Sequence, residues 1–195
     1  MSRTSEFARE TRETQIEVAI DLDTPREPGI STPLPFFSHM LSALAFHGRI
    51  GMTVRATGDV EVDPHHLVED TGIVLGTCLQ NTLADGAVRR FGHAVIPMDE
   101  ALSEATIDVC GRPTLVYRAE FPQTHAGSFP VWLFREFFSG LVMGANIALH
   151  AMCRYGENSH HMVEALFKAV GRAMGEAYTL VGGDAGERMS TKGRI

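Results

Sequence analysis

Cysteine is scarce and scattered in this chain of 195 residues. The three cysteines, Cys78, Cys110 and Cys153, are odd in number and lie far apart in the sequence. That pattern argues against a disulfide framework and against a metal site made of thiolates. We expect all three to be reduced thiols, most of them buried.

Long hydrophobic runs and an excess of positive charge are also missing. No apolar run approaches the length that a membrane span requires, and residues 1–14 lack the apolar segment of a signal peptide. The formal net charge of -7 argues against a nucleic-acid or membrane surface as partner, although a local basic cluster could still hold a small anion. We therefore expect a cytoplasmic protein that acts on a small molecule.

The remaining composition is that of an ordinary globular protein, with 44% hydrophobic and 21% charged residues. The length fits one large domain or two similar halves. Apolar residues that alternate from Ile16 to Leu22 predict a strand, and those at helical spacing from Phe37 to Leu44 predict a helix that ends near Gly48. The same patterns predict a loop at 24–35, a β-hairpin at 52–62, helices at 67–83, 131–144 and 161–181, and strands at 104–110, 114–121 and 147–155.

One short motif occurs twice, as His65-His66-x-x-Glu69 and as His160-His161-x-x-Glu164. The differences 160 - 65, 161 - 66 and 164 - 69 are all 95. Each copy follows a predicted helix and strand and begins another helix. We interpret this order as an internal duplication, with halves at about 12–95 and 96–185 in a single catalytic unit and a C-terminal tail at 186–195.

The repeated motif is suited to binding metal ions. Residues four apart share one face of a helix, so the first histidine and the glutamate of each copy can hold one cation. Adjacent residues diverge around the helix, so His66 and His161 must point elsewhere. The alternative is that both copies are solvated helix starts, which the constant offset disfavours. Imidazole and carboxylate ligands suit Mn, Fe, Co, Ni or Zn, and the sequence does not choose among them.

Two further residues are candidate fourth ligands. His39 and Glu136 each lie near the start of an apolar helix that precedes one copy of the motif. Their positions differ by 136 - 39 = 97, which is the repeat offset plus a two-residue indel. We predict that they occupy matching places in the two halves.

In these residues the chain resembles the imidazoleglycerol-phosphate dehydratase family from about Arg12 to Gly193. The blocks that carry the resemblance include Arg12-Glu13-Thr14, Phe37-Ser38-His39-Met40-Leu41, His47-Gly48, Gly58-Asp59, both His-His motifs, Arg90-Phe91-Gly92, Pro97-Met98-Asp99-Glu100-Ala101, Gly111-Arg112-Pro113, Phe167-Lys168-Ala169 and Ser190-Thr191-Lys192-Gly193.

The resemblance implies a duplicated α/β (α+β) fold of the ribosomal protein S5 domain 2-like kind, with helices on one face of each sheet. It implies a homo-oligomer of 24 subunits built from trimers, with active sites between subunits. It further implies two Mn ions per site, one held by His39, His66, His160 and Glu164 and the other by His65, Glu69, Glu136 and His161.

The implied reaction dehydrates D-erythro-imidazole-glycerol phosphate to imidazole acetol phosphate in histidine biosynthesis. The substrate imidazole would bridge both ions as an imidazolate, and Glu13 would shuttle protons with Glu69 and Glu164 as helpers. The other residues that the resemblance implies in substrate binding, most of them around the phosphate, are His39, His47, Arg90, Arg112, Lys168, Ser190, Thr191 and Lys192.

Two alternatives stay open at this point. Ser38 and Glu136 depart from the usual family residues, which is compatible with a diverged paralogue that acts on another small azole or polyol phosphate. A metal-binding shell without catalysis is the other alternative, although it would not need Glu13 or a phosphate pocket.

Overall fold

The computed structural model describes residues 3–85 and 87–181 as ten strands and four helices, with one short 3-10 turn. The first half contains β1 (Thr4–Glu10), β2 (Thr14–Asp21), β3 (Gly29–Ser31), α1 (Pro35–Gly48), β4 (Gly51–Gly58), α2 (His65–Asn81) and the 3-10 turn Thr82–Asp85. The second half contains β5 (Phe91–Met98), β6 (Ala101–Asp108), β7 (Thr114–Arg118), β8 (His125–Ala126), β9 (Phe129–Pro130), α3 (Leu133–Ala145), β10 (Ala148–Tyr155) and α4 (Ser159–Ala177). The predicted tail at 186–195 lies outside the described residues.

The two halves have the same topology. Their four-stranded sheets have the orders β1-β2-β4-β3 and β5-β6-β10-β7. In both sheets the last pair is parallel, β3 with β4 and β7 with β10, and the other pairs are antiparallel. The predicted duplicated α/β fold is therefore confirmed.

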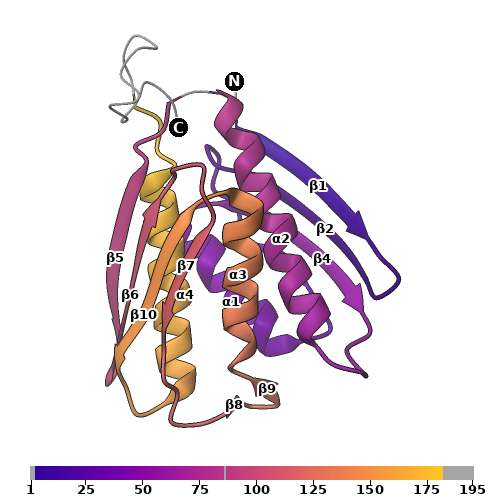
Figure 1. The fold of residues 1–195 in the computed structure, drawn as a ribbon, viewed down its shortest axis with the longest axis vertical. Helices are drawn as coiled ribbons and strands as arrows, with labels where there is room; N and C mark the ends of the chain where they lie inside the picture. Colours follow the sequence, from indigo (N-terminus) through magenta and orange to yellow (C-terminus); the bar gives the residue numbers. More distant parts are fainter. Residues whose placement is uncertain (1–2, 86, 182–195) are drawn as a thin grey trace.

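The four helices lie between the two sheets and share one hydrophobic core (Figure 1). Helix α2 packs on the first sheet and α4 on the second. Helix α1 packs against α4, and α2 packs against α3, so each helix pair joins the two halves. At the ends of the α1–α4 pair and of the α2–α3 pair, side chains from the first half therefore lie beside side chains from the second half.

Glycines let the paired helices touch backbone to backbone. A Cβ atom added to Gly171 of α4 would lie 2.3 Å from the carbonyl oxygen of Leu44 in α1. One added to Gly72 of α2 would lie 2.2 Å from the carbonyl oxygen of Phe137 in α3. Because larger residues would push the helices apart, these glycines set the distance between the ligand-bearing helices.

Three sequence predictions about strands were wrong or incomplete. The predicted hairpin at 52–62 is a single strand, β4, followed by a turn in which Val62 is 79% exposed. The valines of that turn have no sheet partner, because the chain there leads directly into α2. The strand predicted from Ile16 to Leu22 is β2, and neither the mostly exposed edge strand β1 before it nor β5 was predicted.

The four helices and the strands β2, β6, β7 and β10 lie close to their predicted positions. The short strand β3 falls within the predicted loop at 24–35, and the two-residue strands β8 and β9 were not predicted. Among the described residues, no helix is both long and apolar enough to cross a membrane.

Candidate metal centre

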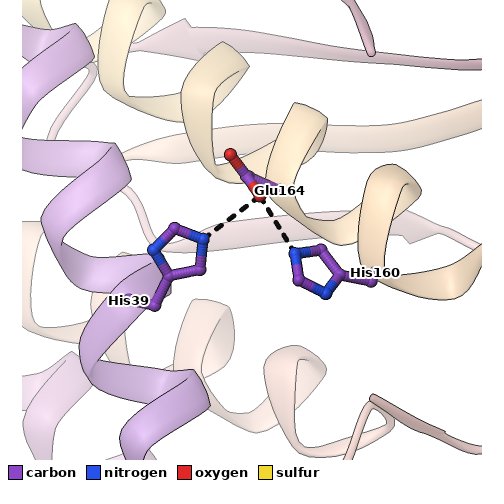
Figure 2. A group of neighbouring side chains, drawn as sticks. All are labelled: His39, His160 and Glu164. Carbon is purple, nitrogen blue, oxygen red and sulfur yellow. Dashed lines mark hydrogen bonds and ion pairs between the residues drawn. The ribbon is translucent and has the colours of Figure 1, made fainter. Parts of the chain in front are cut away.

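Three potential metal ligands converge where α1 meets the beginning of α4 (Figure 2). The Nε2 atoms of His39 and His160 lie 3.2 Å and 3.1 Å from Oε2 of Glu164. One ligand atom from each residue lies within 4.8 Å of the other two. Two imidazoles and one carboxylate at this spacing form a group that can hold a divalent transition metal. We call these residues the first triad.

The glutamate of the first triad is held in its charged form. Glu164 is nearly buried, and burial opposes its ionisation. The hydrogen bonds from Lys168 and His39, helped by that from His160, outweigh burial and lower the pKa of Glu164 to about 2. Nζ of Lys168 lies 2.8 Å from its second carboxylate oxygen, Oε1. The carboxylate is thus ready to bind a cation at neutral pH.

The other copy of the motif begins α2. Nε2 of His65 lies 3.3 Å from Oε2 of Glu69, as the four-residue spacing predicts. Glu136 lies in α3 one turn before Gly140, where an added Cβ would be 2.4 Å from the carbonyl oxygen of Glu69. Glu136 is therefore level with the His65–Glu69 pair, in the place that corresponds to His39. We call His65, Glu69 and Glu136 the second triad.

The second triad is less closely assembled than the first. A carboxylate oxygen of Glu136 lies 3.6 Å from Nη1 of Arg135. Within residues 3–85 and 87–181, the three-ligand group with converging atoms is His39, His160 and Glu164, and Glu136 does not complete a second one.

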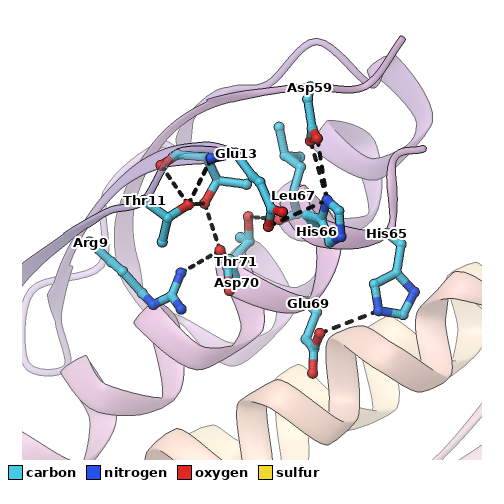
Figure 3. A network of polar contacts seen from close by, with 11 residues as sticks. Arg9, Thr11, Glu13, Asp59, His65, His66, Leu67, Glu69, Asp70 and Thr71 are labelled. Carbon is cyan, nitrogen blue, oxygen red and sulfur yellow. Dashed lines mark hydrogen bonds and ion pairs between the residues drawn. The ribbon is translucent and has the colours of Figure 1, made fainter. Parts of the chain in front are cut away.

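The second histidine of each motif turns away from its own triad. Nδ1 of His66 lies 3.3 Å from Asp59 and 3.6 Å from Glu13. Figure 3 shows His66 between these two carboxylates while His65 faces Glu69. His161 directs Nδ1 to Glu100, at 2.8 Å from Oε2. The predicted divergence of adjacent histidines is confirmed. In each ring Nδ1 is the nitrogen that faces the carboxylate, which belongs to Asp59 for His66 and to Glu100 for His161.

Glu13 belongs to a turn that side-chain hydrogen bonds hold in place. Oγ1 of Thr11 accepts the backbone N–H groups of Glu13 and Thr14, at 3.1 Å and 2.9 Å. The hydroxyl of Thr14 in turn donates to Asp70 at 2.6 Å. Arg9 binds the same carboxylate of Asp70 (Figure 3). The turn is thereby tied to α2, which places Glu13 beside His66.

The described residues among those predicted to bind substrate do not form one cluster within this chain. Lys168 contacts Glu164, as described above, and the pKa of the neighbouring His47 is lowered by burial, with Lys168 and Arg172 adding to the effect. Arg90 forms a two-pronged ion pair with Asp108, at 2.7 Å and 3.2 Å. Arg112 is exposed. Ser190, Thr191 and Lys192 lie outside the described residues.

Two carboxylates beside the candidate ligands were not predicted as site residues. Asp59 faces His66 and Glu100 faces His161. Both occur in blocks that carry the family resemblance, which was the available signal. Glu100 was missed because it reaches His161 through a tertiary contact between segments 61 residues apart in the sequence. Asp59 was missed because its contact with His66 crosses the turn before α2 and follows no helical spacing.

Comparison with known proteins agrees with this arrangement. The family model described as imidazoleglycerol-phosphate dehydratase matches residues 32–174. The imidazoleglycerol-phosphate dehydratase of Limosilactobacillus fermentum is 48% identical over 194 residues, which cover 99% of this chain and 100% of the relative. That of Exiguobacterium sp. is 47% identical over 195 residues, with 99% and 98% covered.

Solved structures are similar over nearly the same length. The crystal structure of imidazoleglycerol-phosphate dehydratase from Staphylococcus aureus has a TM-score of 0.83 and 35% identity, covering 91% of this chain and 99% of that one. IGPD from Pyrococcus furiosus in complex with (S)-C348 has a TM-score of 0.85 and 36% identity, covering 97% and 100%. These matches do not favour a diverged paralogue or a non-catalytic shell. The chain belongs to the imidazoleglycerol-phosphate dehydratase family, and it is a hydro-lyase of histidine biosynthesis.

Proposed function

We propose that this chain dehydrates imidazole-glycerol phosphate with two manganese ions per active site, one at each triad. The observation that carries the proposal is the convergence of His39, His160 and Glu164 on one point between α1 and α4. Their nitrogen and oxygen donors, without thiolate, suit Mn²⁺ and the neighbouring divalent metals. The duplicated fold supports a second ion at His65, Glu69 and Glu136.

We further propose that each ion takes its fourth ligand from another subunit. His66 and His161 turn away from the triads of their own chain, so they are free to complete those of neighbouring chains. One ion would then be held by His39, His160, Glu164 and a neighbour's His66, and the other by His65, Glu69, Glu136 and a neighbour's His161. This sharing requires a homo-oligomer, for which we propose 24 subunits built from trimers.

The reaction removes a proton from carbon and expels a hydroxyl group as water. Bound divalent cations supply Lewis-acid stabilisation of the negative charge that develops on the substrate's imidazole ring. Glu13 lies on an anchored turn, 3.6 Å from His66, which we propose as a metal ligand. Its carboxylate would therefore be beside the bound substrate, where it can accept a proton and return it. The glutamates of the triads, Glu69 and Glu164, would assist it.

Basic side chains would bind the substrate phosphate. Lys168 extends from the first triad on the same helix, and its ammonium group can bridge Glu164 and a phosphate oxygen. We assign the remaining phosphate contacts to Arg90, Arg112, Ser190, Thr191 and Lys192, and a substrate contact to His47. Arg90 would then exchange or share its contact with Asp108 when the phosphate binds.

The location and domain organisation are also proposals. We propose a cytoplasmic enzyme that forms one catalytic unit from halves at about 12–95 and 96–185, with the tail at 186–195 carrying phosphate ligands.

The number of ions tests this arrangement directly. Metal-free protein titrated with Mn²⁺ is expected to bind two ions per chain, measured by equilibrium dialysis with elemental analysis. His65→Ala should remove one ion, because its triad keeps only two carboxylates, and His160→Ala should remove the other. His125→Ala, which changes an exposed histidine on β8, is the control and should retain both. Native protein that binds one ion or none would contradict the proposal.

A further inference from the structure

The tight turn between β5 and β6 carries a carboxylate that turn geometry does not require. Met98 pairs with Ala101 across the two strands, so the loop consists of Asp99 and Glu100 alone. Asp99 has a φ of 48°, a left-handed backbone that such two-residue loops use and that glycine or asparagine adopts more easily. Aspartate tolerates this backbone, and the turn makes no demand on the side chain of Glu100, whose contacts lie outside the turn.

Glu100 contacts the beginning of α4 with both carboxylate oxygens. Its Oε1 accepts the backbone N–H groups of Glu157 and Asn158, at 3.0 Å and 2.8 Å. Its Oε2 lies 2.8 Å from Nδ1 of His161. One side chain therefore holds both the loop that precedes α4 and the imidazole ring on its first turn.

The contact with His161 determines which ring nitrogen carries the proton. A carboxylate can only accept hydrogen bonds, so Nδ1 must be the donor, and Nε2 of the neutral ring is then left with its lone pair. Nε2 lies 3.5 Å from the side-chain amide of Asn158 and 3.7 Å from Asp99, so neither is close enough for a strong hydrogen bond. Nε2, which keeps its lone pair, is therefore the nitrogen that can bind a metal ion.

We infer that Glu100 is a positioning residue, which fixes the direction and tautomer of His161 so that Nε2 is presented to a metal ion of a neighbouring subunit. This inference rests on the proposed role of His161 as a metal ligand. Carboxylates that orient metal-binding histidines in this way are a general feature of metal sites. In the first half a carboxylate of Asp59 also lies beside Nδ1 of His66, at the longer distance of 3.3 Å.

The Glu100→Gln variant distinguishes two roles of Glu100, which are orientation of the His161 ring and support of the loop before α4. Its amide oxygen can still accept the two backbone N–H groups, but its NH₂ group then faces Nδ1 of His161. Nδ1 must then accept a hydrogen bond from this NH₂ group. The proton of the neutral ring consequently lies on Nε2, where it blocks metal binding. Alanine removes all three contacts and leaves the tautomer free. Glu104→Gln is the matched control, because Glu104 lies on the adjoining strand and pairs with Arg154 instead.

We expect Glu100→Gln to weaken Mn²⁺ binding at one of the two sites by about 10- to 100-fold, and to weaken it more than Glu100→Ala does. Glu100→Ala should lower the melting temperature of the metal-free protein more than Glu100→Gln does. Glu104→Gln should leave both Mn²⁺ affinities unchanged. Mn²⁺ titration followed by electron paramagnetic resonance measures the affinities, and calorimetry measures the melting temperatures.

Two outcomes would overturn the inference, and they are distinguishable from failure of the proposed metal site. Native Mn²⁺ affinity in Glu100→Gln would exclude orientation of His161 by Glu100. An affinity loss that is larger for Ala than for Gln, in the same order as the melting temperatures, would reduce Glu100 to a structural support. If His161→Ala also keeps both ions at native affinity, the assignment of His161 as a ligand fails, and the inference fails with it.

Discussion

Replacing Glu164 with glutamine is expected to lower kcat/KM by about 1,000-fold or more, equivalent to about 4 kcal/mol of transition-state stabilisation. The carboxylate is the only anionic member of the first triad, and its Oε2 lies within 3.2 Å of both imidazole nitrogens. An amide of the same shape would leave an ion with two neutral imidazoles from this chain. Mn²⁺ affinity and turnover, measured together, should fall together.

The loss should be nearly independent of pH. The pKa of Glu164 is about 2, so the native carboxylate stays charged over the range from about pH 5 to pH 9 in which activity is measured. A carboxyl group with a lowered pKa becomes protonated only at still lower pH, where the native enzyme would begin to behave like the glutamine variant. Glu176→Gln makes the same change farther along α4, where Glu176 pairs with Arg89, and should keep native Mn²⁺ binding. Native affinity in Glu164→Gln would contradict the first triad.

Replacing Glu13 with glutamine is expected to lower kcat by about 100- to 10,000-fold while leaving Mn²⁺ affinity unchanged. Glu13 is not part of either triad, but its anchored turn holds it beside His66. Loss of a proton carrier slows the chemical step, whereas loss of a ligand removes the ion. Steady-state kinetics and Mn²⁺ titration of the same sample separate the two effects.

Glu10→Gln is the matched control for Glu13, because Glu10 is an exposed residue at the end of the neighbouring strand β1. It should retain native kcat. If Glu13→Gln also keeps native kcat, another group must move the protons. If Glu13→Gln instead loses Mn²⁺, the role of Glu13 is to support His66 as a metal ligand and not to carry protons.

The helices could be predicted closely because their apolar spacing is regular and their ends carry recognisable residues. Leu67 and Val68, for example, mark the buried face of α2. Strand β1 was missed because its residues are mostly exposed and it is held by backbone pairing with β2 at the sheet edge. The false hairpin arose because Val60 and Val62 continue the alternation of β4, although the chain has already turned away from the sheet.

The candidate site could be predicted where it depends on spacing within one helix. The four-residue spacing brings His160 to Glu164, and the repeat offset identified His39 and Glu136 as counterparts. The carboxylates that orient the second histidines could not be predicted in this way. Glu100 reaches His161 only because the β5–β6 turn folds against the start of α4, a contact that no periodicity encodes.

The most direct test of the account is turnover of D-erythro-imidazole-glycerol phosphate by this protein with and without Mn²⁺. The Mn²⁺-loaded protein is expected to form imidazole acetol phosphate, to lose this activity when a chelator removes the ions, and to regain it when Mn²⁺ is restored. Absence of product from protein shown to hold two ions per chain, or full turnover by protein shown to hold no metal, would contradict the account.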